Sequence, residues 1–130
     1  MMNIALIAVI VSLVGLAIAA LLYKKVTSVE IDDPTVAGIT QQIQDGAMAF
    51  LKAEYRYLAI FVGVVAVLLF FVTESDGHLT ALAFLGGALA SVLAGFSGMK
   101  AATAANGRTA MAAQKEGQAG ALAVSYNGGA

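Results

Sequence analysis

The sequence has few charged residues and no cysteine. Lys, Arg, Asp and Glu make up 12% of its 130 residues, and hydrophobic residues make up 60%. Because about a quarter of a typical soluble domain is charged, this composition excludes an ordinary water-soluble fold. The absence of cysteine excludes a disulfide framework, a thiolate metal site and a sulfur nucleophile. The net charge of −1 leaves no basic stripe, so we expect no nucleic-acid partner.

Three long stretches contain no Asp, Glu, Lys, Arg or His. They cover about residues 4–23, 57–73 and 79–99. Each is long enough, or nearly so, to cross about 30 Å of hydrocarbon as a helix. The sequence therefore predicts an all-α fold, a polytopic transmembrane helical bundle, with residues 1–130 as the N-terminal part of a single transmembrane domain.

The uncharged stretches also limit the chemistry of this chain. An ionisable residue inside a span costs on the order of 3 kcal/mol and is kept for function. Its absence here excludes the ring-forming, proton-carrying hairpins of rotary ATP synthases, which need a carboxylate in mid-membrane. The chain also has no phosphate-binding G-x-x-x-x-G-K-[ST] loop, no H-E-x-x-H motif and no Asp pair spaced to hold Mg²⁺. We nominate no catalytic, cofactor-binding or metal-binding residue.

The seven basic residues predict an orientation. They lie between the first two stretches or after the third: Lys24, Lys25, Lys52, Arg56, Lys100, Arg108 and Lys115. Basic flanks mark the cytoplasmic side, so we expect the N-terminus outside, residues 24–57 inside, residues 73–78 outside and the chain after Met99 inside. Because Lys24 and Lys25 follow the first stretch instead of preceding it, we expect it to be retained and not cleaved as a secretory signal.

A cytoplasmic amphipathic helix is predicted over about residues 34–56. Asp33 before Pro34 is a typical helix start, with Asp as the N-cap and Pro at the first helical position. Apolar residues then recur every three or four positions. The helix either lies on the membrane surface or packs on a neighbour, with Tyr55 and Tyr57 as interfacial anchors and Lys52 and Arg56 as headgroup contacts.

The third stretch is rich in small residues. Two rows recur every four positions: Ala83, Gly87, Ser91 and Gly95, and Gly86, Ala90, Ala94 and Gly98. Such rows let helices approach closely, so we expect this helix to be buried among further helices. The second and third stretches should form a tight antiparallel hairpin. Its connecting loop ends at His78, which we expect to face solvent and not to bind metal.

The third helix is predicted to continue beyond Met99 into the cytoplasm. Gly107 and Gly117 are its candidate ends or bends, and a fourth span is expected to start at about residue 118. A dozen residues cannot cross a bilayer. We therefore interpret the chain as the front part of a longer protein.

Two cytoplasmic segments resemble membrane-integral pyrophosphatases. Residues 43–55, IQDGAMAFLKAEY, resemble the stretch before the second helix of that family, and residues 98–110, GMKAATAANGRTA, resemble the end of its third helix. Residues 117–130 resemble the start of its fourth helix. The matching region covers about residues 38–130, and two separated matches in the right order are more specific than either alone.

The resemblance implies a large multi-helix subunit, a homodimer, in a bacterial inner membrane. Such a protein would hydrolyse Mg²⁺-bound pyrophosphate and drive H⁺, or in some members Na⁺, across the bilayer, with K⁺ as a further cofactor of some members. The residues that bind Mg²⁺ and pyrophosphate would lie downstream of this chain. The matched residues have an implied role in scaffolding and helix docking: Asp45, Glu54, Lys100, Asn106 and Arg108.

Two departures from the family pattern leave the subclass open. Gly107 stands where a larger residue is expected, and it should loosen the helix by about 1 kcal/mol relative to Ala. Residues 125–127 lack an expected basic residue. Two other classes stay open: a small non-enzymatic membrane scaffold or assembly subunit that is complete as it stands, and a solute carrier without hydrolysis.

Overall fold

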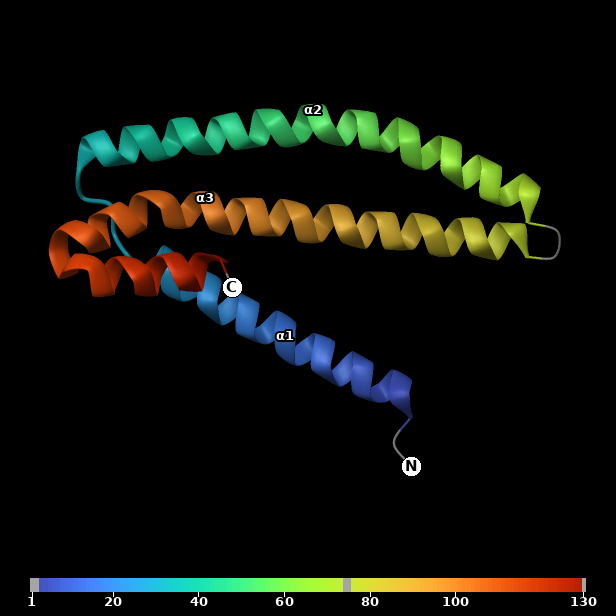
Figure 1. Cartoon of the computed structure of the whole chain (residues 1–130), viewed down its shortest axis with the longest axis horizontal. Helices are drawn as coiled ribbons and strands as arrows, with labels where there is room; N and C mark the ends of the chain where they lie inside the picture. The colour runs from blue at the N-terminus through green and yellow to red at the C-terminus, as the bar shows by residue number, and fades with distance from the viewer. Residues whose placement is uncertain (1–2, 74–75, 130) are drawn as a thin grey trace. The chain divides into compact units, whose positions relative to one another are not determined.

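The computed structural model describes residues 3–73 and 76–129, and its regular elements are three α-helices. They are α1 (Ile4–Thr27), α2 (Pro34–Val72) and α3 (Gly77–Gly129), as Figure 1 shows. The predicted all-α fold class is confirmed. The chain divides into a terminal unit, Met1–Gln42 with Ala101–Ala130, and a hairpin unit, Ile43–Lys100.

Helix α1 is apolar on all sides. The Asn3 side chain caps its start by accepting a hydrogen bond from the Ala5 amide at 3.2 Å. Lys24 and Lys25 lie in its last turn, where their positive charge complements the helix dipole. Val26 is the one residue of this helix that is buried. A helix that is long, apolar all round and exposed has the length and composition of a membrane span.

Helix α2 joins the predicted amphipathic segment and the second apolar stretch in one continuous helix. Its predicted start is confirmed, because the Asp33 carboxylate accepts hydrogen bonds from the amides of Thr35 (2.7 Å) and Val36 (3.3 Å). No turn interrupts the helix between Pro34 and Val72. A single helix therefore contains both the amphipathic first half and the apolar second half.

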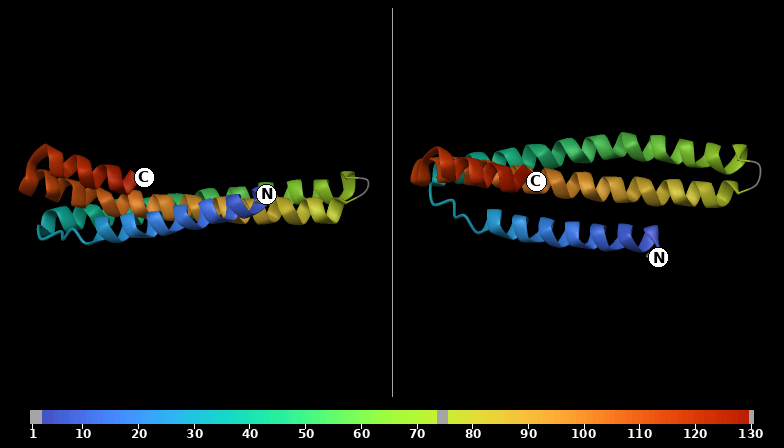
Figure 2. Two further views of the ribbon diagram at one scale, coloured as in Figure 1. Left: turned by 90° about the horizontal axis from the view of Figure 1, so that it is seen from below. Right: turned by 60° about the horizontal axis from the view of Figure 1, so that its bottom comes forward.

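The hairpin unit consists of α2 from Ile43 onward and α3 up to Lys100, which run antiparallel and side by side (Figures 1 and 2). The Tyr55 hydroxyl donates a hydrogen bond to the Val92 carbonyl at 3.1 Å. Gly95 makes room for that hydroxyl, since a Cβ there would lie 3.3 Å from it. The predicted hairpin is confirmed, although Glu74 and Ser75 of its connection lie outside the described residues.

Helix α3 contacts α2 mainly with a side other than its two rows of small residues, although Gly95 of the first row lies beside the Tyr55 hydroxyl. The side that is least exposed within the hairpin unit carries Ala81, Phe84, Ala88, Val92 and Met99. All eight members of the rows are exposed, and a Cβ added at Gly86, Gly87 or Gly98 would meet no atom within 4 Å. Packing of further helices on these rows therefore stays a prediction.

A sharp bend divides α3 at Gly117. This residue has φ 70° and ψ −161°, so the predicted bend at Gly117 is confirmed. The bend proposed at Gly107 is wrong, because the helix runs through it with helical dihedral angles. After Gly117 the last helical segment turns back along the preceding part of α3 (Figure 1). Gly128 lies so close to the Ala105 side chain that a Cβ on Gly128 would collide with it.

Replacing Gly117 should destabilise the terminal unit. Its dihedral angles lie in a region that is essentially restricted to glycine, so Gly117→Ala should lower the free energy of unfolding by about 1–3 kcal/mol. The matched control is Gly38→Ala, because Gly38 is helical with open space around its Cβ position. The control should gain up to about 1 kcal/mol. Equal effects in denaturation of the detergent-solubilised protein would contradict the proposed strain.

Candidate functional site: the linker-docking cluster

The connection between α1 and α2 is held against the end of α3 within the terminal unit. Six residues make or accommodate these contacts, and we call them the linker-docking cluster: Val29, Asp32, Thr40, Gly107, Arg108 and Lys115. They come from the connection, from the first turns of α2 and from α3 before its bend. Two chain segments that are far apart in sequence, residues 29–40 and 107–115, therefore meet there.

Arg108 holds the backbone of the connection. Its Nε donates a hydrogen bond to the Val29 carbonyl at 3.0 Å, and its Nη1 donates to the Ala104 carbonyl at 2.7 Å, one turn earlier in α3. The side chain is half-buried. A hydrogen bond from a charged donor contributes about 1.5–3 kcal/mol, more than a neutral one. Arg108 is thus the main polar link between the connection and α3.

Lys115 adds an ion pair at the surface. Its Nζ lies 2.6 Å from Oδ2 of Asp32, with both side chains at least half exposed. The hydrogen bond from Lys115 holds the pKa of the Asp32 carboxyl below its ordinary value of 3.8, and a backbone hydrogen bond acts in the same direction. Because water and salt screen an exposed pair, it contributes much less than the buried contacts of the cluster.

Thr40 and Gly107 form the closest packing in the cluster. Thr40 is 5% exposed, and its hydroxyl donates to the Val36 carbonyl at 2.7 Å. A Cβ on Gly107 would collide with the Thr40 hydroxyl and would lie 3.1 Å from Cδ1 of Ile31. The glycine therefore does more than loosen the helix: its missing side chain allows α2 and the connection to approach α3.

The cluster joins backbone segments and has no arrangement suited to a reaction. Its carboxylate is in an ion pair and its guanidinium is bound to carbonyl oxygens. In the part of the chain that the structure describes, no three His, Asp or Glu side chains are grouped so that they could hold a metal ion. We therefore derive no metal-dependent step from these residues.

Of the residues matched by the family resemblance, only Arg108 belongs to the cluster. Asp45, Glu54 and Lys100 belong to the hairpin unit. Asp45 and Lys100 each have an interaction partner, and Glu54 and Asn106 are exposed. Sequence reasoning missed Val29, Thr40 and the pairing of Asp32 with Lys115. Neither Val29 nor Thr40 belongs to a motif, so the only available signal was the unexpected glycine at position 107.

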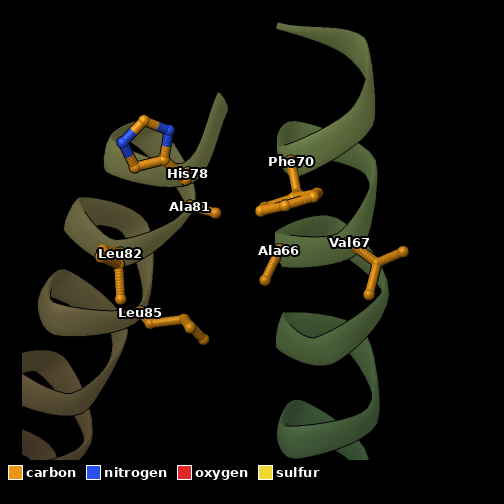
Figure 3. Close-up of a pocket in the computed structure, with 7 residues that line it drawn as sticks. All are labelled: Ala66, Val67, Phe70, His78, Ala81, Leu82 and Leu85. Carbon is orange, nitrogen blue, oxygen red and sulfur yellow. The ribbon is translucent and has the colours of Figure 1, made fainter. Parts of the chain in front are cut away.

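An apolar groove lies between α2 and α3 near the hairpin connection (Figure 3). It has an open volume of about 380 Å³ and is lined by Ala66, Val67, Phe70, His78, Ala81, Leu82 and Leu85. His78 is exposed, as predicted, but it lies in the first turn of α3 and not in a loop. Its imidazole is the one polar side chain among the lining residues, so the groove offers an apolar surface and no pair of reactive groups.

Comparison with known proteins gives a consistent family match. Residues 13–130 match the family described as inorganic H⁺ pyrophosphatase. The K(+)-insensitive pyrophosphate-energized proton pump of Pyrobaculum aerophilum is 38% identical over 100% of this chain, which corresponds to 18% of that protein. The K(+)-stimulated pyrophosphate-energized sodium pump of Thermotoga maritima is 37% identical over 92% of this chain and 16% of that protein.

A third relative has higher identity over a shorter region. The K(+)-insensitive pyrophosphate-energized proton pump 2 of Moorella thermoacetica is 45% identical over 71% of this chain, or 13% of that protein. The chain spans less than a fifth of the length of these curated relatives. No solved structure matches it.

The contact between Thr40 and Gly107 can be tested with a double-mutant cycle. Gly107→Ala places a methyl group against the Thr40 hydroxyl, and such overpacking costs about 1–3 kcal/mol. Thr40→Ala in the same chain removes that hydroxyl and should recover most of the loss. The measurement is the free energy of unfolding of the wild type, both single variants and the double variant. Additive effects would show that the two positions do not touch.

The ion pair between Asp32 and Lys115 should stabilise the fold only when the carboxylate is ionised. Because the pKa of Asp32 is lower in the folded chain, its contribution is present above 3.8 and is lost as the pH falls through the folded value. Asp32→Asn should therefore lower the unfolding midpoint at neutral pH but not at strongly acidic pH, and high salt should reduce the difference. Lys115→Gln should behave alike. A difference that persists in acid would refute this assignment.

Proposed function

The chain belongs to the inorganic H⁺ pyrophosphatase family, and we propose that it is the N-terminal portion of a membrane pyrophosphatase. In this proposal the whole protein hydrolyses Mg²⁺-bound pyrophosphate and uses the released free energy to move H⁺ or Na⁺ across the membrane. The observation that carries the proposal is the match over residues 13–130, which includes nearly all of the three helices that can cross a membrane.

This chain would supply scaffold and not chemistry. The residues that bind pyrophosphate and Mg²⁺ would lie in the remainder of the polypeptide, so we assign no catalytic residue here. The hydrogen bonds from Arg108 to the Val29 and Ala104 carbonyls support a docking role for this residue. In that role the linker-docking cluster fixes the end of α1 and the start of α2 against α3, on the side of the membrane where we expect hydrolysis to occur.

The assembly and location follow from the same proposal. The protein would be a homodimer in the bacterial inner membrane, with the linker-docking cluster on the cytoplasmic side. The positions of the seven basic residues support this orientation. Relatives named as K⁺-insensitive proton pumps and as K⁺-stimulated sodium pumps match at 38% and 37% identity. Sequence identity in this region therefore does not distinguish proton pumps from sodium pumps, or K⁺-insensitive from K⁺-stimulated ones.

The proposal can be tested in membrane vesicles from cells that express the complete reading frame containing this chain. We expect release of phosphate from added pyrophosphate that requires Mg²⁺ and is absent from vesicles of cells with an empty vector. Pyrophosphate should also drive either acidification, abolished by a protonophore, or uptake of Na⁺. Adding K⁺ separates the stimulated class from the insensitive class.

Two results would contradict the proposal. Transport of a solute without release of phosphate would indicate a carrier. A reading frame that ends at Ala130 and gives a stable product without pyrophosphatase activity would indicate a scaffold subunit.

A further inference from the structure

One lateral face of α2 carries two basic side chains followed by small residues. Lys52 and Arg56 are exposed and four positions apart, so they lie on one face of the helix. Ala59 and Gly63 continue the same row toward the apolar half of α2. We propose that this face, which we call the basic row, binds a phospholipid with an anionic headgroup: Lys52 and Arg56 hold its phosphate, and an acyl chain lies over Ala59 and Gly63.

The two basic groups are available to a ligand. Among residues 3–73 and 76–129, neither Lys52 nor Arg56 has a hydrogen bond or an ion pair. Glu54 is two positions from each of them and so lies toward the opposite side of the helix. Both cations directly precede the apolar stretch that begins near Leu58. At that depth long basic side chains extend toward the headgroup layer while their stems stay along apolar surface.

The small residues provide space for the lipid tail. A Cβ added at Gly63 would meet no atom within 4 Å, so the helix surface is open above this position. The large apolar side chain of Ile60 lies beside the row and is 62% exposed. We call the surface over Ala59 and Gly63, where the acyl chain would lie, the tail seat. Gly63 lies about 10 Å along the helix from Arg56. The tail seat is therefore within the hydrocarbon layer when the two cations lie at the edge of that layer.

The basic row borders the face that packs against α3, and its four residues are exposed in the hairpin unit: Lys52, Arg56, Ala59 and Gly63. Within the hairpin unit that face includes the buried residues Leu51 and Ala66 and the half-buried Tyr55. Formation of the hairpin therefore leaves the row uncovered. Its charge determines the occupant: two cations complement a net negative headgroup, whereas a zwitterionic headgroup brings its own cation close to them. Free phosphate has the charge but no tail for the apolar seat.

The test measures lipid binding to the purified full-length protein by native mass spectrometry. The probes are phosphatidylglycerol and phosphatidylcholine with identical acyl chains. The wild type should prefer phosphatidylglycerol, and the Lys52→Gln/Arg56→Gln double variant should lose about thirtyfold in affinity for it, the order expected for two interfacial charges. Gly63→Leu should weaken binding of both lipids by severalfold, because it fills the tail seat without changing charge.

The matched control is the Lys24→Gln/Lys25→Gln double variant, which removes the same charge from the exposed end of α1. It should bind both lipids like the wild type. An equal loss in the two double variants would overturn the proposal in favour of non-specific attraction. An unchanged Gly63→Leu variant would also overturn it, as would displacement of the lipid by inorganic phosphate at equal concentration.

Discussion

The cost of placing charge in hydrocarbon constrains the rest of this structure. It keeps three stretches free of Asp, Glu, Lys, Arg and His and confines the basic residues to their flanks. It also requires the backbone to bond within each helix, which is why the chain forms long continuous helices. Charged contacts then lie outside these stretches, where Arg108 and Lys115 of α3 hold the segment between α1 and α2. Within the apolar part, the Tyr55 hydroxyl is paired with a backbone carbonyl.

In both units, glycine residues allow a neighbouring side chain to lie close to the helix backbone. In the terminal unit, Gly107 receives Thr40, and Gly128 lies against Ala105. In the hairpin unit, Gly95 leaves room for the Tyr55 hydroxyl. Glycine costs helix stability, and the packing of a neighbouring side chain into the space at each glycine offsets that cost. The bulky side chains stay largely on the outside, where lipid or further helices can cover them.

In the function that we propose, scaffold and chemistry lie in different parts of the protein. This chain corresponds to less than a fifth of its relatives and contains a docking cluster but no grouped metal ligands within the residues described. An arginine bound to two backbone carbonyls is suited to the scaffold role that we propose for this chain. Membership in a family with both proton and sodium pumps is compatible with one such frame serving different transported ions.

The sequence by itself determined the all-α class, the places where helices can cross a membrane, the start of α2 at Asp33 and Pro34, the hairpin and the bend at Gly117. These depend on local properties: hydropathy over one segment, a cap of one residue, the free dihedral angles of one glycine. The three-dimensional contacts were needed to show that α3 meets α2 mainly with a face other than its small-residue rows, that Gly107 lies against Thr40, and that Arg108 binds the carbonyl of Val29. Such contacts join residues far apart along the chain, and a backbone carbonyl is the same at every position, so no residue pattern marks which one a side chain will reach.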